Sequence, residues 1–496
     1  MRRTRRTGLA TLALTAALLA GACSSDDGGG ASGGSSGTGG EGAAVDLPPC
    51  PVDALDGATG PVDVTVWHSY TAVTEETLLA MADDYNASQD QVRVTIENQS
   101  SYEELWRKYQ QGIASNQLPT IAIPDDTLTR QTIDSQTILP AQSCIDATDY
   151  DVSQLLDVSR SYYTLDGVLY PSSLNSSAPL LYYNKNHFRK AGLDPETTPG
   201  TLDEVREYAQ QIKDAGVVDT PVVLNLSPAI VENFLTGAGI PIVDNDNGRG
   251  DGETTESTFA DERTVELLTW IQDMVADGLL EVVPPIDNQF EHYLAMANQS
   301  ASMTIETSTA ATSVEAFLGG DLDLGSLPDE AAGASDEGVD LEALDIGAGQ
   351  NPGIDAPGQV QMGGGAWYIT LAGTDEQQAA AWDFLSWFNE PAQQARWSAE
   401  GSYLPYNTGA LDEPVLQEAW TGSLSGQWLA LAYDELSTGV DPDFPGPLIG
   451  PYEQIRAAER EAIDQLVFAD GDPATIAQDT QDTATEALQQ YQDENF

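Results

Sequence analysis

From residue 61 onward, the pattern of apolar and polar residues predicts strands and helices in alternation. Val62, Val64 and Val66 alternate with polar residues, which is typical of a strand with one buried face. Residues 74–86 then place apolar side chains at i, i+3, i+4 and i+7, the spacing of one helical face. Residues 92–96 again predict a strand. This alternation favours an α/β fold with largely parallel sheets.

Capping motifs indicate where several helices begin. A Ser or Thr followed three residues later by Glu or Gln can satisfy backbone N–H groups that a helix start leaves free. The motif occurs at Ser101-x-x-Glu104, Thr201-x-x-Glu204 and Thr374-x-x-Gln377. Short apolar runs predict further strands at 120–123, 180–183 and 221–226. The chain after Pro451 is expected to be helical with a break at 471–473, and the acidic segments 244–258 and 329–345 are expected to be surface loops.

The N-terminal segment has the features of a bacterial lipoprotein signal. Four arginines before residue 7 precede an apolar run over 8–20. Ala20-Gly21-Ala22-Cys23 follows and resembles the lipobox, in which the cysteine is acylated and becomes the new N-terminus. We therefore expect a signal peptide over 1–22, a lipid anchor at Cys23 and a flexible Gly/Ser-rich tether over 23–48. The twin arginines leave the export route open.

The charge of the chain excludes one class of partner. Among 496 residues, Asp and Glu total 79 against 19 Lys and Arg, so the formal net charge is -60. Such a surface repels nucleic-acid phosphates and anionic lipid headgroups, so we expect no nucleic acid and membrane contact only through the lipid anchor. With 41% hydrophobic residues, the chain can nevertheless build sizeable cores.

Cysteine and histidine usage indicates an oxidising compartment without a metal site. Cys50 and Cys144 are the two cysteines left after the lipobox, and outside the cytoplasm we expect a disulfide between them. The three histidines are far apart in sequence and show no metal-binding spacing, so neither zinc nor another cofactor is expected.

Several motifs occur in a distinctive order along the chain. They begin with Val64-Thr-Val-Trp67-His68-Ser69 and Ser101-Tyr102-Glu103. Asn175-Ser-Ser-Ala-Pro-Leu-Leu-Tyr-Tyr-Asn-Lys185 follows, and Gly401-Ser-Tyr-Leu-Pro405 comes near the end. In their order and spacing these motifs resemble the carbohydrate-type family of ABC-importer solute-binding proteins, especially its glycerol-3-phosphate-binding branch. The resemblance extends from about residue 62 to the C-terminus.

The resemblance implies a two-lobed, type II periplasmic-binding-protein-like α/β fold whose lobes close on a ligand at a hinge. The chain is expected to change lobe near Ser172, Ser302 and Gly363. Lobe 1 would then comprise 49–172 plus 302–362, and lobe 2 would comprise 173–301 plus 363–496.

The resemblance also implies a set of ligand-binding residues with short polar or aromatic side chains, which suit a polyol or sugar. Carried over position by position, the set is Trp67, Tyr102, Asp126, Ser176, Ser177, Ser308, Gly364 and Tyr403. No catalytic residue is implied.

The chain departs from the glycerol-3-phosphate branch at the positions that hold the phosphate. Leu448 stands where that branch has an arginine, and Asn225 and Pro228 replace its tryptophans. Burying a phosphate without a cation costs several kcal/mol, so a neutral sugar or polyol is favoured over a phosphorylated ligand.

Four functions are compatible with the sequence. The favoured one is a monomeric, lipid-anchored receptor on the extracellular face of the cytoplasmic membrane that delivers a carbohydrate or polyol to an ABC permease. A receptor for glycerol-3-phosphate or a glycerophosphodiester is the nearest alternative. A secreted carbohydrate-active hydrolase and a non-transport surface protein of the same fold are the others; no nucleophile motif in a suitable context supports the hydrolase.

Overall fold

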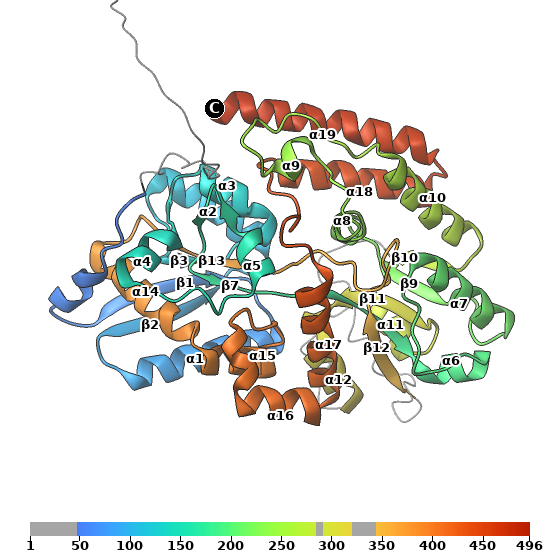
Figure 1. Ribbon diagram of the computed structural model, residues 1–496, viewed down its shortest axis with the longest axis horizontal. Coiled ribbons are helices and arrows are strands. Elements are labelled where there is room, and N and C mark those ends of the chain that lie inside the picture. Colours follow the sequence, from blue (N-terminus) through green and yellow to red (C-terminus); the bar gives the residue numbers. More distant parts are fainter. Residues whose placement is uncertain (1–46, 284–290, 320–343) are drawn as a thin grey trace, which may run out of the picture. The chain divides into compact units, whose positions relative to one another are not determined.

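Two β-sheets with helices packed around them organise the chain (Figure 1). The computed structural model describes residues 47–283, 291–319 and 344–496. The expected signal peptide, the anchor Cys23 and nearly all of the tether lie outside the described residues, as does most of the acidic segment 329–345. Among the described residues, no helix is both long enough and apolar enough to cross a membrane.

The first sheet has the strand order β2-β1-β3-β13-β4, and β7 also pairs with β13. Strand β1 runs parallel to β2 and β3, with Val64 opposite Val94, whereas β13 runs antiparallel to β3, β4 and β7. The strands are β1 (Val62–His68), β2 (Val92–Asn98), β3 (Ile121–Ala122), β4 (Ile138–Leu139), β7 (Ser173–Leu174) and β13 (Ala366–Thr370).

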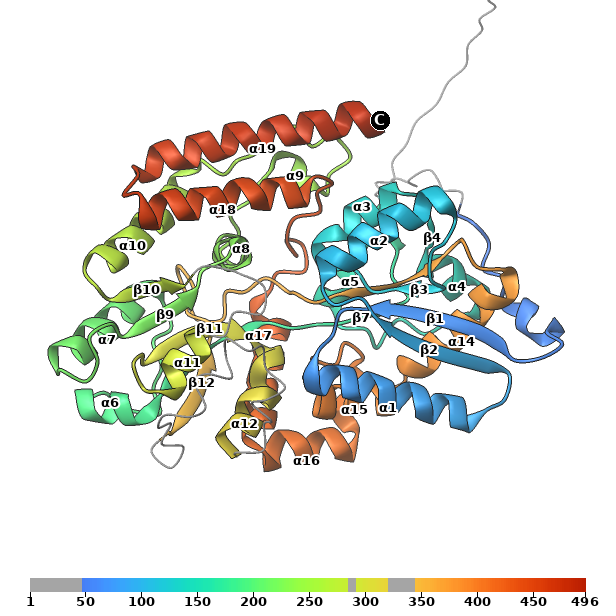
Figure 2. The same ribbon diagram turned by 180° about the vertical axis from the view of Figure 1, so that it is seen from behind.

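Helices cover both faces of the first sheet, with α1, α14 and α15 on one side and α2 and α3 on the other (Figures 1 and 2). The helices of this lobe are α1 (Ala72–Ser88), α2 (Tyr102–Ser115), α3 (Thr129–Asp134), α4 (Ala141–Thr148), α5 (Asp157–Tyr162), α14 (Asp375–Phe388), α15 (Pro391–Gly401) and α16 (Pro414–Gly422). Shorter elements are η1 (Val52–Gly57), η2 (Asp126–Leu128), η6 (Thr408–Asp412), β5 (Thr164–Leu165) and β6 (Val168–Leu169).

The second sheet has the strand order β10-β9-β11-β8-β12, in which β9, β10 and β11 are parallel and β8 is antiparallel to β11 and β12. Its strands are β8 (Pro179–Asn184), β9 (Val222–Asn225), β10 (Leu280–Val283), β11 (Met303–Thr307) and β12 (Ile346–Gln350). Around it lie α6 (Lys185–Ala191), α7 (Leu202–Asp214), α8 (Pro228–Gly237), α9 (Asp244–Gly248), α10 (Glu262–Ala276), α11 (Glu291–Ala297), η3 (Ser308–Ala310), α12 (Ala311–Gly319), α17 (Leu424–Gly439), α18 (Tyr452–Phe468) and α19 (Pro473–Asn495).

The two-lobed α/β fold is confirmed, but the expected assignment of segments to lobes is wrong. Strand β11 pairs with β8, with Met303 opposite Tyr183, so 302–362 does not return to the first lobe. Strand β13 lies between β3 and β4 of the first sheet, so 363–496 does not belong as a whole to the second lobe. The chain crosses between β7 and β8, between β12 and β13, and between α16 and α18, by way of α17, which contacts α16 and α5 of the first lobe as well as α12 and β12 of the second. Because β8 and β13 are antiparallel to their neighbours, both sheets are mixed rather than largely parallel.

The helix starts predicted from capping motifs are confirmed. Ser101 Oγ accepts from Glu104 N at 3.1 Å, and Thr201 Oγ1 accepts from Glu204 N at 3.3 Å. Only the motif at Thr374 has both reciprocal bonds, since Gln377 Oε1 also accepts from Thr374 N at 3.1 Å. At the other two starts the Glu carboxylate binds Arg107 or the N–H of Gly200 instead.

Cys50 and Cys144 are joined by a disulfide, with their Cα atoms 4.9 Å apart. The bond ties the segment just before η1 to α4 of the first lobe. Since the two residues are 94 positions apart, the crosslink restricts a long loop of the unfolded chain.

The segment 244–258 is only in part the surface loop expected from its acidity, because residues 251–253 are exposed but Asn247, Thr254 and Ser257 are buried. Asn245, Asp246 and Asn247 adopt left-handed backbone angles, and Asn247 is buried. Its Oδ1 accepts from the N–H groups of Ile242 and Val243. A Cβ on Gly248 would come within 2.4 Å of the Leu448 carbonyl oxygen, so this segment packs directly against the third crossing.

Candidate ligand-binding site

A cavity of about 270 Å³ lies where the two lobes and two of the crossings meet. Residues near the carboxyl ends of β9 and β11 line it, as expected for ligand sites in α/β sheets. The first lobe contributes Asp125 and Asp126. The crossings contribute 177–179 and 361–363, and the second lobe contributes Asn225, Ser227, Ala229, Ile230, Asn233, Ile305, Glu306, Thr307 and Arg456.

Asp126 is the expected ligand residue that is held most firmly at this cavity. Its Oδ2 accepts from the Tyr162 hydroxyl at 2.7 Å, and its Oδ1 accepts from Gly364 N at 3.2 Å. Burial raises the pKa of Asp126 to about 8, and the neighbouring charge of Asp125 adds to this effect. The carboxyl group is therefore a fixed hydrogen-bonding group in the wall of the cavity.

Gly364 acts through its backbone. Its φ is +128°, and a Cβ there would come within 2.6 Å of the Asn175 carbonyl oxygen, so only glycine fits without displacement. Besides its bond to Asp126, its carbonyl accepts from the Tyr163 hydroxyl at 3.1 Å. Gly364 does not itself line the cavity, but it positions a residue that does.

The three expected serines have different positions. Ser177 lines the cavity, and its backbone pairs with Gly363 in both directions, which holds the first two crossings side by side. Ser176 is buried, and its Oγ contacts Ser159 Oγ at 2.8 Å rather than the cavity. Ser308 is also buried, and its Oγ accepts from Ala178 N at 3.3 Å. Ser176 and Ser308 therefore fix the hinge in this structure.

The expected aromatic residues lie outside the cavity lining. Tyr403 stacks on Trp397 with ring centroids 5.7 Å apart and lies beside Tyr102. Burial raises the pKa of Tyr403 to about 12. A Cβ on Gly365 would lie 3.0 Å from the Tyr102 hydroxyl, so this pair packs behind the second crossing. Trp67 donates from Nε1 to Glu97 Oε2 at 3.0 Å on the neighbouring strand β2.

Sequence reasoning missed the charged residues of the second lobe. Arg456 donates to the buried Glu232 from Nε at 3.0 Å and from Nη2 at 2.6 Å, and its Nη1 is 4.0 Å from Asp125 Oδ1. Glu306 Oε2 lies 2.9 Å from His292 Nε2. Burial opposes ionisation of Glu306, but the hydrogen bond with His292 lowers its pKa. Arg456 could have been predicted as a site residue from one sequence feature: it is a cation, rare in this chain, next to the buried stripe of an amphipathic helix.

The structure also shows where the three residues that depart from the glycerol-3-phosphate branch lie. Asn225 lines the cavity, whereas Pro228 is the buried first residue of α8. Leu448 is buried at the third crossing and donates from its backbone N–H to Asn247 O at 3.0 Å. No cation therefore stands at that crossing position.

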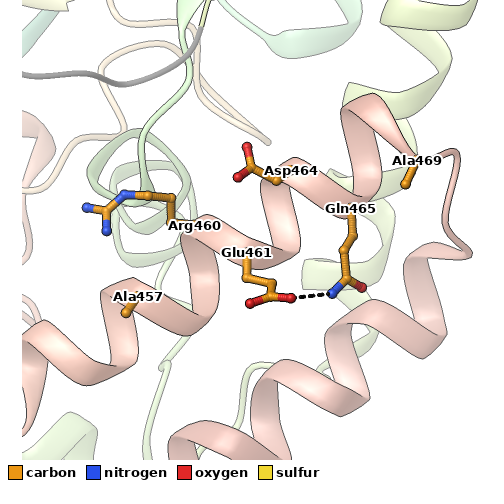
Figure 3. Close-up of a pocket in the computed structure, with 6 residues that line it drawn as sticks. All are labelled: Ala457, Arg460, Glu461, Asp464, Gln465 and Ala469. Carbon is orange, nitrogen blue, oxygen red and sulfur yellow. Dashed lines mark hydrogen bonds between the residues drawn. The ribbon is translucent and has the colours of Figure 1, made fainter.

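A second depression lies on α18 and is formed by one helix alone (Figure 3). Its residues are Ala457, Arg460, Glu461, Asp464, Gln465 and Ala469, all of them exposed. Gln465 Nε2 donates to Glu461 Oε1 at 3.1 Å, so part of its polar surface is already paired. A single exposed helix face does not enclose a ligand, and we do not regard it as the binding site.

The described ranges also contain no group of three or more His, Cys, Asp or Glu side chains arranged to hold a metal ion.

The chain is similar in sequence to known proteins. Residues 80–421 match the family model described as bacterial extracellular solute-binding protein. The sn-glycerol-3-phosphate-binding periplasmic protein UgpB of Pectobacterium atrosepticum is 26% identical over 362 residues, which is 72% of this chain and 76% of that protein. The Escherichia coli protein of the same name is 24% identical over 353 residues, covering 70% of this chain and 75% of the relative.

Solved structures share the fold. The cyclic alpha-maltosyl-1,6-maltose binding protein of Arthrobacter globiformis has a TM-score of 0.62 and 23% identity, covering 86% of this chain and 99% of that one. UgpB from Mycobacterium tuberculosis, solved with glycerophosphocholine, has a TM-score of 0.66 and 16% identity, covering 88% and 100%. The family resemblance drawn from the sequence is therefore confirmed, and the chain belongs to the bacterial extracellular solute-binding proteins that serve ABC importers.

Proposed function

We propose that this chain is a lipid-anchored receptor that captures a neutral sugar or polyol between its lobes and delivers it to an ABC permease. The observation that carries the choice of ligand is the charge of the cavity. Among the described lining residues, Arg456 is the one cation, and it already binds Glu232, whereas Asp125 and Glu306 are carboxylates. An anionic ligand would enter a site with surplus negative charge and pay for desolvation as well.

The remaining polar groups of the cavity suit hydroxyl recognition. Asn225 and Ser227 border it from the second lobe and Ser177 from the crossings. A sugar hydroxyl donates and accepts at once, so it needs neighbouring donors and acceptors of this kind. Hinge closure would then exclude water and strengthen those bonds.

Anchoring at Cys23 and a Gly/Ser-rich tether are part of the same proposal. A tethered receptor stays near its permease while the flexible segment lets it rotate and dock. Replacing Cys23 by Ser is expected to release the protein from the membrane fraction into the medium. Retention of the variant on membranes would contradict lipid anchoring at this residue.

A receptor for glycerol-3-phosphate or a glycerophosphodiester is the second candidate. It is favoured by the names of the relatives, which are glycerol-3-phosphate-binding proteins at 24–26% identity. Leu448 and the pairing of Arg456 with Glu232 argue against it. A catalytic role is not part of the proposal, because the relatives are binding proteins.

A thermal-shift screen of the chain carrying Cys23→Ser tests the proposal. The panel comprises mono- and disaccharides, polyols, glycerol-3-phosphate and glycerophosphodiesters. A ligand at about 100 times its Kd stabilises the fold by roughly 2.7 kcal/mol, which is a clear shift in Tm. We expect a neutral sugar or polyol to give this shift and to be recovered unchanged. A shift with glycerol-3-phosphate alone, or consumption of the sugar, would overturn the proposal.

A further inference from the structure

We propose that Glu232, a buried carboxylate behind the cavity wall, determines the charge selectivity of the site. Glu232 would neutralise the charge of Arg456 and fix its orientation. The cavity would then bind the hydroxyl groups of a neutral ligand and exclude a phosphate group. This inference rests on the proposed function because it concerns the same site. Glu232 does not line the cavity, so it is a positioning residue that acts through Arg456.

Hydrogen bonds to Glu232 hold one edge of the Arg456 guanidinium in place. Glu232 is fully buried on α8 and receives the Arg456 Nε–H at 3.0 Å and an Nη2–H at 2.6 Å. The Tyr452 hydroxyl also donates to Glu232 Oε2 at 3.1 Å, and the guanidinium lies 4.9 Å from the centre of the Tyr452 ring. A bidentate pair of this kind fixes both the plane and the direction of the guanidinium.

The other edge of the guanidinium faces the ligand. Arg456 lines the cavity, and its Nη1 is 4.0 Å from Asp125 Oδ1. A ligand hydroxyl placed between them can accept from Nη1 and donate to the Asp125 carboxylate, so that both of its functions are satisfied. A phosphate dianion only accepts, and it would face the carboxylates of Asp125 and Glu306 at the same time.

Glu459 is a second buried acid next to Glu232, but it adds no negative charge to the Arg456–Glu232 pair. It is almost fully buried beside Glu232. Burial, together with the charge of Glu232, raises the pKa of Glu459 well above its ordinary value, so it keeps its proton. The buried group therefore holds one positive and one negative charge, and little of the Arg456 charge remains to attract an anion.

The direct test is Glu232→Gln, which keeps the size of the side chain and removes its charge. Calorimetric titration with inorganic phosphate and with sn-glycerol-3-phosphate is expected to show affinity increased by about tenfold or more over the wild-type chain, since an uncompensated Arg456 gains at least one strong ion pair. Adding Arg456→Gln to this variant should abolish the gain. A folded Glu232→Gln chain whose anion affinity equals that of the wild type would overturn the inference.

Two matched variants separate charge from structure. Glu459→Gln changes a neighbouring carboxyl that is already neutral, and Glu232→Asp keeps the charge, so both should leave anion affinity unchanged. Thermal unfolding without ligand shows whether each variant folds. If Glu232→Gln does not fold, Glu232→Met removes the same charge with an apolar side chain of similar length; increased anion affinity there supports the inference and unchanged affinity overturns it.

The two proposals fail in different ways. If no neutral sugar binds the wild-type chain but Glu232→Gln gains anion affinity, the charge selectivity holds and the carbohydrate ligand is wrong. If a neutral sugar binds the wild-type chain and Glu232→Gln gains nothing, the receptor function holds and the role of Glu232 is wrong. Tight binding of sn-glycerol-3-phosphate to the wild-type chain overturns both.

Discussion

At the scale of single residues, the site depends on groups whose positions are fixed from several elements at once. Asp126 stands at the start of η2, yet its two oxygens are held by Tyr162 of α5 and by Gly364 of the second crossing. Such a carboxyl group is already oriented before the ligand arrives, so little ordering entropy is lost on binding. Residues that only pack nearby should matter much less for affinity.

This difference predicts the effect of substitutions at Asp126 and Trp67. Asp126→Ala removes a buried hydrogen-bonding group from the cavity wall and is expected to weaken binding of the neutral ligand by about 1–3 kcal/mol. Trp67→Phe changes a side chain bound to Glu97 outside the cavity lining and should leave affinity unchanged. Titration of both variants with the same sugar measures the difference. Equal effects would show that the cavity is not the ligand site.

Glu435 gives a prediction about pH at the same scale. It is fully buried on α17, accepts from Asn351 N at 2.7 Å, and burial raises its pKa from 4.5 to about 8. The folded chain thus holds this proton to a higher pH than the unfolded chain. Its contribution to stability is complete below the unfolded pKa of 4.5 and is lost as the pH rises through about 8.

Glu435→Gln is always neutral, so its free energy of unfolding relative to the wild type should increase between pH 5 and pH 8. The limit for one proton is about 1.4 kcal/mol per pH unit. Urea unfolding across this range measures the slope, and the exposed Glu418→Gln is the control. Parallel pH profiles for the Glu435→Gln and wild-type chains would contradict the assignment.

At the scale of elements, local signals and long-range links contribute differently. The caps at Ser101, Thr201 and Thr374 set helix starts through bonds within four residues, and these starts were predictable from the sequence. The short segment η1 has no buried residue of its own and is tied to α4 by the Cys50–Cys144 disulfide. Attachment of this segment therefore relies on a covalent link.

Removing the link should lower stability without changing the ligand site. Cys50→Ser with Cys144→Ser is expected to lower the free energy of unfolding by about 2–4 kcal/mol. Ligand affinity should be unchanged, because neither cysteine lines the cavity. Denaturant unfolding and titration of the double variant measure both quantities. Unchanged stability would show that the bond does not constrain the unfolded chain.

At the scale of the whole molecule, contacts between the lobes converge on Arg249. Its Nε donates to Gly446 O at 2.5 Å at the third crossing, and its Nη2 donates to Tyr162 O at 3.0 Å in the first lobe. The guanidinium also lies 5.2 Å from the centre of the Tyr162 ring. Since Tyr162 binds Asp126, this one residue connects the second lobe to the cavity wall.

Arg249→Met is therefore expected to destabilise the chain by about 2–4 kcal/mol, because it leaves buried carbonyl groups without a donor. The matched control is Arg263→Met, which removes an exposed ion pair with Asp355 and should cost no more than about 1 kcal/mol. Denaturant unfolding of the two variants compares them. Similar losses would show that the Arg249 bonds between the lobes contribute little.

Features set by neighbouring residues could be predicted from the sequence, whereas features set by contacts across the whole molecule could not. The α/β alternation and the helix starts depend on neighbouring residues, and they were predicted correctly. Lobe membership depends on which strands pair, and β13 pairs with β3 and β4 although all strands of the second sheet lie between β4 and β13 in the sequence. Asp126 and Ser177 were placed at the cavity by resemblance, whereas Ser176, Ser308 and Trp67 bind other parts of the protein. Arg456 was not predicted as a site residue because its partners Glu232 and Asp125 come from distant segments of the sequence.

The central claim is that the cleft binds a neutral polyhydroxyl ligand without transforming it. Isothermal titration of the Cys23→Ser chain tests it most directly, with the sugar or polyol of largest thermal shift in one cell and sn-glycerol-3-phosphate in a parallel run. We predict saturable one-to-one binding of the neutral ligand, its recovery unchanged, and no heat of binding from the phosphate ester. Saturable binding of sn-glycerol-3-phosphate alone, or turnover of the sugar, would contradict the claim.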